Sequence, residues 1–368
     1  MRRGCDVGEW RTDPTFAMCR ALVDGAELSS FVGGPFDVRA VTAAIRPEAT
    51  DGFLLDEVPW EHFPQGDHVR EAVHLLHTGD SPLRTGTGVV SGMCANDMRA
   101  ATVLAVPFLI RIAADTCHPH RADALAEVSS PARARHFGVA SRNELLLHRT
   151  DTRDDTLYDD YGVEVTGYPA GWSVAAARAA ITADTALLLP LLNDPSPATR
   201  IRAAYALATA ADPDRTVRAA FRTRLGAEED PIVRAALVLA AAETTRNHPH
   251  PPTTEWIREL WRDRTQAPEV RLAAAIGWLC LTDEPTPDDL CVAVDDLASD
   301  ERAHAMDALP WMAAASRSGE TGLRHCIREM LHPEQPDPAG YDDPWAANQS
   351  SRRLVGWGPR QQGGRGCQ

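Results

Sequence analysis

Apolar residues recur through the C-terminal half of the chain with the spacing of a single helix face. One stripe runs from Val233 to Ala241 and another from Val270 to Leu281. Both follow the i, i+3, i+4, i+7 pattern of a helix that buries one side. Further helical patterns accompany these stripes, and we expect such second helices at 213–225, 253–264, 286–299 and 320–331.

Many of the predicted helices carry one short signature: an apolar residue, then Arg, with apolar residues three, four and seven positions after the first. It occurs at Val38-Arg39, Val69-Arg70, Met98-Arg99, Ile201-Arg202, Val217-Arg218, Val233-Arg234 and Val270-Arg271. A repeated helix that cannot bury its own apolar face must stack on a copy of itself, and helix pairs spaced about 35–40 residues apart are typical of solenoids. The sequence therefore predicts an all-α fold, an α–α superhelix.

The other segments are less regular. Helices are expected at 14–24, 36–46, 96–115 and 173–193, and internal prolines should kink or restart the last two. The segment 129–172, rich in Arg, Asp, Gly and Tyr, is expected to be an irregular insertion. We therefore expect three parts: an irregular helical segment at 1–66, and a solenoid at 67–331 that is clearest at 194–282. The third part is a tail at 333–368, expected to be mostly disordered.

Composition excludes several kinds of chemistry. All 37 basic residues among the 368 are Arg, and there is no Lys. This excludes a side-chain Schiff base with pyridoxal phosphate, a Walker A site and a protein kinase, and no cofactor is expected. The net charge of −15 at pH 7 disfavours nucleic acid and anionic membranes over most of the surface.

Cysteine usage and hydropathy bear on location. The eight cysteines form no C-x-x-C pair, and we interpret them as reduced thiols. The N-terminal stretch MRRGCDVGEW lacks the apolar region of a signal peptide, and no apolar run has the length of a membrane span. These observations predict a cytoplasmic protein with no membrane partner.

Three stretches carry a resemblance to a known family: DPSPATRIRAAYALATAADPDRTVRAAF, EEDPIVRAALVLAAAE and APEVRLAAAIGWL. They resemble HEAT repeats, and AVPFLIRIAAD with HPHRADAL resembles the helical core of actinobacterial HEAT-repeat proteins. The resemblance implies an armadillo-like α-solenoid. It also implies a protein-interaction scaffold, although a minority of HEAT proteins are enzymes, including alkylpurine DNA glycosylases and bilin lyases.

The second helices repeat a doubled arginine, two positions four apart on one helix face. The residues are Arg218, Arg222, Arg258, Arg262, Arg324 and Arg328. Second helices of HEAT stacks usually line the concave side, so these arginines are expected to form a ladder there that binds an anionic ligand or an acidic partner. The alternative is that they form structural ion pairs with the nearby acids Glu255, Glu259, Asp263, Asp288, Asp295 and Asp296.

A second hypothesis is a HEAT-fold enzyme acting on a small molecule or peptide. Its pocket would lie in the irregular 85–172 region and use His118, His120, Asp159, Asp160, Tyr161 or Trp172. A DNA glycosylase or other DNA binder is a third hypothesis, disfavoured by the acidic charge. The acidic loop 151–160 lacks the spacing of a known metal site, and so do the histidine pairs His74/His77 and His118/His120. No metal is therefore expected.

Overall fold

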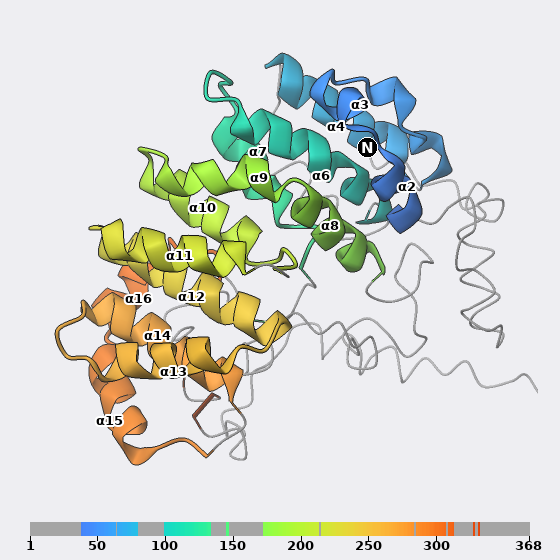
Figure 1. Ribbon diagram of the computed structural model, residues 1–368. Coiled ribbons are helices and arrows are strands. Elements are labelled where there is room, and N and C mark those ends of the chain that lie inside the picture. The colour runs from blue at the N-terminus through green and yellow to red at the C-terminus, as the bar shows by residue number, and fades with distance from the viewer. Residues whose placement is uncertain are drawn as a thin grey trace, which may run out of the picture.

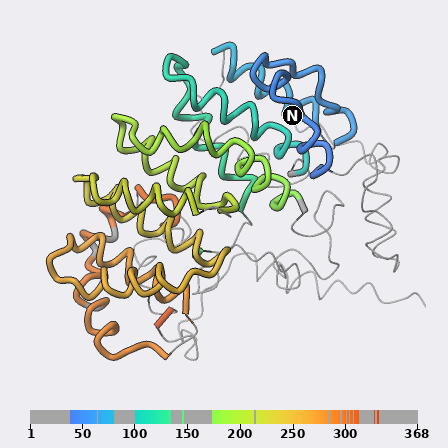
Figure 2. Tube along the Cα trace, in the orientation of Figure 1, coloured from blue at the N-terminus to red at the C-terminus, as the bar shows by residue number. Residues whose placement is uncertain are grey.

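The computed structural model describes residues 38–63, 65–79, 99–133, 145–146, 172–212, 215–282, 285–306, 308–312, 327 and 330–331. Every regular element in this part of the chain is a helix, and the helices stack side by side into an elongated array (Figures 1 and 2). The predicted all-α solenoid is therefore confirmed. The helix expected at 14–24 and the tail 333–368 lie outside the described residues.

Three helix pairs build the C-terminal half. The first helices are α10 (Pro197–Leu207), α12 (Pro231–Asn247) and α14 (Pro268–Leu281), which pack on one another in chain order. The second helices are α11 (Thr216–Ala227), α13 (Pro251–Arg262) and α15 (Asp288–Leu297), which pack on α12 and α14 (Figure 1). A short α16 (Asp300–Met306) follows. The expected second helices are thus present within a few residues of their predicted bounds, except 320–331, which is largely outside the described residues.

Capping residues account for where these helices begin. Asp230 accepts the backbone N–H groups of Ile232 and Val233, and Pro231 occupies the first turn, where its missing N–H costs nothing. The pair Asp194-Pro195 resembles Asp230-Pro231 and predicts the same role for Asp194, but there Ser196 is the N-cap and accepts from Thr199. Asp194 instead accepts the N–H of Ser196 and orders the turn before the helix.

The N-terminal half continues the same stack. It comprises α2 (Val38–Ala44), α3 (Pro47–Asp51), η3 (Leu55–Glu57), η4 (Trp60–His62), α4 (Gly66–Thr78), α6 (Arg99–Ala114), α7 (Arg121–Val128), α8 (Trp172–Ala183), α9 (Thr185–Leu188) and η7 (Leu189–Asn193). Helix α6 runs through Pro107 without interruption, whereas the chain around Pro190 changes to a 3-10 helix.

Trp60 connects the segment 38–63 to the solenoid. Its ring is buried against Phe108 of α6, and its Nε1 donates to the carbonyl of Leu55 at 2.7 Å. A Cβ atom at Gly66 would lie 1.9 Å from the Trp60 carbonyl oxygen, so only glycine allows α4 to begin this close. The N-terminal helices therefore share one core with α6.

Helix α12 is buried on every side between Ala235 and Thr245. Ala242 faces Gly277 of α14, and Thr244 reaches the carbonyl of Ala208 beyond α10. Successive helical residues are turned by about 100°, so Glu243 points between those two neighbours, where Arg133 and Trp311 bind it. The chain's own segments around 133 and 311 therefore cover this side of α12.

The predicted insertion 129–172 is only partly described. Residues 129–133 and 145–146 belong to the core, with Ala132 and Leu146 fully buried, and Trp172 begins α8. The rest of that segment lies outside the described residues. Among the described helices no single one is both long and apolar enough to cross a membrane; the helices 173–183 and 185–193 pass that test only as a pair, across a 65° bend.

Candidate interaction surface

The arginine of the first-helix signature binds backbone carbonyls. Arg234 donates to the carbonyls of Leu225 and Glu228 at 3.2 and 3.1 Å, and Arg271 donates to that of Trp261 at 3.2 Å. The last carbonyls of a helix have no partner within the helix, and a guanidinium with five donors can satisfy them. The signature joins the start of one helix to the end of the preceding one.

Arg218, the first residue of the predicted ladder, does not lie on an open surface. Its Nε is 3.1 Å from Asp212 Oδ2, and its guanidinium also donates to the carbonyl of His248 at 3.1 Å. Only 9% of the Arg218 side chain and 1% of the Asp212 side chain are exposed. The same carboxylate accepts the first amides of α11, from Val217 and Arg218. Arg218 therefore holds the start of α11 against the turn before α13.

The next three arginines of the predicted ladder lie against tryptophan rings. The guanidinium carbons of Arg222, Arg258 and Arg262 are 5.3, 5.4 and 4.8 Å from the ring centroids of Trp256, Trp278 and Trp261. These distances suit cation–π attraction. The set therefore forms an arginine–tryptophan row across α11 and α13. Arg324 and Arg328 lie outside the described residues.

The members of this row differ in their acidic neighbours. Arg258 lies 3.1 Å from Glu255 and Arg262 lies 3.3 Å from Asp289, both in partly exposed ion pairs. Arg222 is exposed, and no carboxylate pairs with it in the part of the chain that the structure describes. Ion pairs, the structural alternative drawn from the sequence, are thus present at Arg258 and Arg262, although Asp289 was not among the acids expected. The anion-binding ladder stays a prediction.

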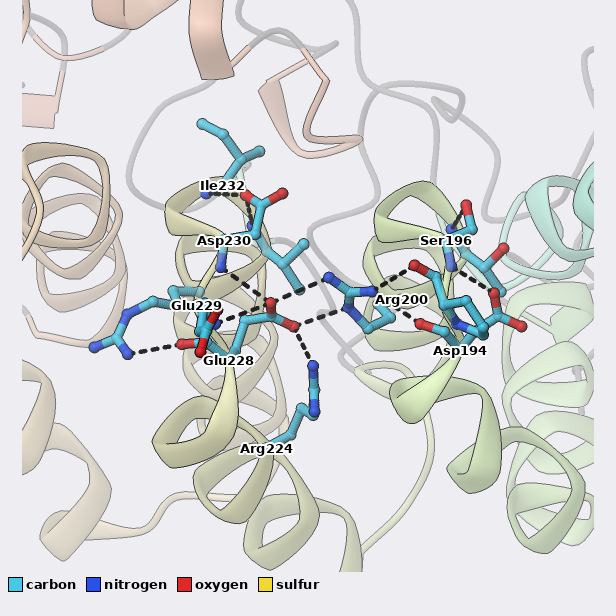
Figure 3. A network of polar contacts seen from close by, with 12 residues as sticks. Asp194, Ser196, Arg200, Arg224, Glu228, Glu229, Asp230 and Ile232 are labelled. Atoms are coloured by element: carbon cyan, nitrogen blue, oxygen red, sulfur yellow. Dashed lines mark hydrogen bonds and ion pairs between the residues drawn. The ribbon is translucent and has the colours of Figure 1, made fainter.

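A polar network joins α10, α11 and the start of α12 (Figure 3). Glu228 Oε2 lies 2.8 Å from Arg200 Nε and 2.6 Å from Arg224, while Oε1 accepts the amides of Glu229 and Asp230. Burial alone would raise the pKa of Glu228, but the hydrogen bonds from Asp230, Arg224 and Arg200 outweigh it and lower that pKa. Glu228 therefore joins α10, α11 and the start of α12 as a carboxylate.

A second buried carboxylate, Glu243, belongs to α12 itself. Glu243 is fully buried, accepts from Arg133 at 2.8 and 3.0 Å, and accepts from Trp311 Nε1 at 2.6 Å. The Arg133 guanidinium stacks 3.3 Å from the Tyr205 ring centroid, and Trp311 meets the same ring edge-on. The sequence does not single out Glu228 or Glu243 as a site residue. Arg200, Arg133 and Trp311 are distant in the chain, and the i, i+4 spacing of Arg224 and Glu228 is common on helix surfaces.

The histidines of the predicted pocket gather at another place, between α4 and α7. His77 stacks on Phe53 with ring centroids 3.6 Å apart, and His118 lies 6.2 Å from His77 and 6.1 Å from His120. His118 Nδ1 accepts the amide of His120, and Nε2 contacts the His77 carbonyl. Both nitrogens of His118 are thus engaged within the protein. Asp159, Asp160 and Tyr161 of the predicted pocket lie outside the described residues. Within the described residues, no three His, Cys, Asp or Glu side chains form a possible metal site.

The histidine cluster predicts an acid-sensitive stability. Burial, and then the charges of His118 and His74, lower the pKa of His77, while Asp115 acts in the opposite direction. A lowered histidine pKa favours the neutral form in the folded state. The resulting stabilisation is complete above the unfolded value of about 6.5 and is lost as the pH falls through the folded pKa. His77→Phe keeps a ring on Phe53, so its Tm should fall less than that of the wild type between about pH 7 and 5.

The control for this prediction is the exposed His68 of the same helix. His68→Gln should leave the pH dependence of Tm unchanged. A His77→Phe protein whose Tm falls with acid as steeply as the wild type would show that His77 is not responsible.

The fold and this surface define the class as an α-solenoid of helix pairs. Residues 185–277, which include α10 to α13 and most of α14, match the family described as HEAT repeats. Comparisons with curated proteins and with solved structures gave no match. The family match supports a HEAT-repeat protein. The resemblance to actinobacterial members stays a prediction, as does the division at 66 and 67.

Proposed function

We propose that this protein is an interaction scaffold that binds a protein partner with an acidic surface through the arginine–tryptophan row of α11 and α13. HEAT repeats commonly mediate protein interactions. The observation that carries the proposal is the row itself, in which Arg222, Arg258 and Arg262 all lie against tryptophan rings. The sequence led us to expect the arginine ladder on the concave side of the solenoid. The proposal needs only that the row is accessible to a partner.

Two physical arguments support this surface. Arginine and tryptophan are enriched among the residues that contribute most to protein–protein binding, and the row offers its arginines and the partly exposed Trp256, whereas Trp261 and Trp278 are buried supports. A guanidinium held against a ring loses less rotational freedom on binding than a free one, so less of the binding energy is offset. The Glu228 network and the Arg218–Asp212 pair hold α11 in place at its two ends. The row is therefore a prearranged set of guanidinium groups, of which Arg222 has no acidic partner among the described residues.

The test has two stages. A photocrosslinking residue in place of the exposed Thr223 of α11 identifies partners in cells, and the same residue in place of the exposed Glu48 is the control. The affinity of the purified partner is then measured for Arg222→Glu/Arg258→Glu/Arg262→Glu. We expect a loss of at least about 30-fold, the size of a binding hot spot, with Tm close to that of the wild type.

Arg218→Glu is the contrasting variant. Because Arg218 is buried against Asp212, we expect this change to destabilise the fold. Partner affinity that is unchanged in the triple reversal would end the proposal. A triple reversal that unfolds would be replaced by the corresponding Gln variants, for which the same loss is expected.

The enzyme hypothesis gains no specific observation. Two of its candidate histidines contact the protein's own backbone, and most of its other residues lie outside the described residues. A cytoplasmic location and the absence of nucleic-acid partners stay predictions.

A further inference from the structure

Three arginines lie along the first turns of α11. Arg215 is the residue directly before the helix, in a left-handed conformation with φ of 60°, and Arg218 and Arg222 lie four residues apart on one helix face. Arg218 and Arg222 face the segment that begins α13: Arg218 donates to the His248 carbonyl, and Arg222 lies over Trp256. The charges of all three act on His250, which lies between those two contacts in the chain.

Among the described residues, only the carboxylate of Asp212 balances these three charges. Asp212 is buried, and its two oxygens are bound by Arg218 and by the first amides of α11. Arg215 and Arg222 are exposed, and neither has a carboxylate partner among the described residues. Within the described part of the chain, Asp212 is also the acid whose charge acts on His250. The described residues of the corner between α11 and α13 therefore carry excess positive charge in a chain of net charge −15.

Backbone amides contribute little to this corner. Asp212 already binds the free amides of Val217 and Arg218, and α13 begins with Pro251 and Pro252, which have no N–H. Any anion here would be held by side chains. Guanidinium groups bind carboxylates and phosphate esters in a bidentate manner, and Trp256 supports one of the two available guanidinium groups.

We propose that Arg215 and Arg222, with His250 beside them, form an oxyanion site that binds a carboxylate or phosphate group on a peptide segment of the partner. The proposal rests on the proposed function and identifies which part of the row recognises the partner. Arg258 and Arg262 already have acids of the same chain, so they would add less to binding. A peptide is favoured over nucleic acid because the acidic chain repels a long polyanion beyond this corner.

His250 supplies a direct readout. Burial, followed by the charges of Arg218, Arg215 and Arg222, lowers the pKa of His250, while Asp212 raises it. A bound anion offsets the arginine charges and should raise the pKa of His250. The titration is followed by NMR on the full chain with labelled histidines, and His250→Gln assigns the signal. Millimolar inorganic phosphate should raise the pKa in the wild type and have no effect in Arg215→Gln/Arg222→Gln, whose His250 pKa should already be higher.

Peptide binding distinguishes the source of the oxyanion. Three synthetic peptides share one neutral sequence and differ at its centre: a phosphoserine, an Asp-Glu pair or a Ser-Ser pair. We expect the phosphoserine or the Asp-Glu peptide to bind the wild type at least about tenfold more tightly than the Ser-Ser peptide, and Arg215→Gln/Arg222→Gln to remove that preference. Tighter binding of either charged peptide supports the site, and the peptide that binds shows whether the oxyanion is a phosphate or a carboxylate.

Several outcomes would overturn the inference. Phosphate that leaves the His250 pKa unchanged would show that no anion binds, whatever the peptides do. A single-stranded oligonucleotide that binds more tightly than both charged peptides, with a steep salt dependence, would indicate a nucleic-acid site instead.

Partner affinity separates this inference from the proposed function. If Arg258→Gln/Arg262→Gln weakens partner binding and Arg215→Gln/Arg222→Gln does not, the inference fails and the scaffold proposal stands. If neither pair weakens binding, both fail.

Discussion

Glu228→Ala should lower the free energy of unfolding by about 3–5 kcal/mol, the usual cost of removing one partner from a buried ion pair. The side chain is 3% exposed and binds Arg200, Arg224 and two backbone amides. Its removal leaves Arg200, itself nearly buried, with only the carbonyls of Asp194 and Pro195. The measurement is denaturant unfolding followed by circular dichroism.

The adjacent Glu229 provides the matched control. Glu229 is exposed, so Glu229→Ala should change stability by less than about 0.5 kcal/mol. The pH dependence gives a second check. The lowered pKa of Glu228 stabilises the protein above the unfolded value of about 4.3 and stops doing so as the pH falls through the folded pKa. The stability of Glu228→Ala should therefore decline less than that of the wild type between about pH 5 and 3. Equal stabilities of the two alanine variants would refute this role.

Local signals accounted for the helices. The stripe at 233–241 lies within α12 and the stripe at 270–281 within α14, because the 3.6-residue period reflects burial directly. The helix starts were less predictable. Ser196 replaced Asp194 as the cap, since either residue can accept a free amide and the sequence does not say which one the chain brings into position.

The arginines show where sequence reasoning stops. Arg234 and Arg271 bind carbonyls, an acceptor that every residue has and that leaves no trace in the sequence. Arg218 and Arg222 have the same local pattern, yet one is buried on Asp212 and the other is exposed over Trp256. Their difference depends on how α11 lies against the start of α13. Periodicity within one helix cannot report that arrangement.

Long-range contacts were missed for a related reason. His77 meets His118 across 41 residues, and Arg133 meets Glu243 across 110. From the sequence, the two histidine groups could together form a zinc site only in principle, and their spacing argued against one. Glu243 lies in an apolar run, where a single acid on a buried helix indicates a partner without identifying it.

Glu243→Ala should also lower the free energy of unfolding by about 3–5 kcal/mol. Its local effects should appear in other parts of the chain than those of Glu228→Ala. Glu243 is the shared acceptor of Arg133 and Trp311, which lie 110 and 68 residues away in the chain. Without it, both segments lose a charged hydrogen-bond partner on the buried side of α12. We therefore expect hydrogen exchange to accelerate most in peptides covering 129–133 and 308–312, and least in α4, which packs on α6 and η4 at the other end of the stack.

Two variants make this pattern interpretable. Glu259→Ala removes an exposed glutamate of α13 and should change neither stability nor exchange appreciably. Trp311→Phe keeps an aromatic ring against Tyr205 but removes the Nε1 donor. It should lower the free energy of unfolding by about 1.5–3 kcal/mol, typical of a hydrogen bond to a charged group. Because Glu243→Ala and Trp311→Phe break the same hydrogen bond, the double variant should lose less stability than the sum of the two single losses. Additive losses, or faster exchange spread evenly over the chain, would mean that Glu243 does not hold these segments to α12.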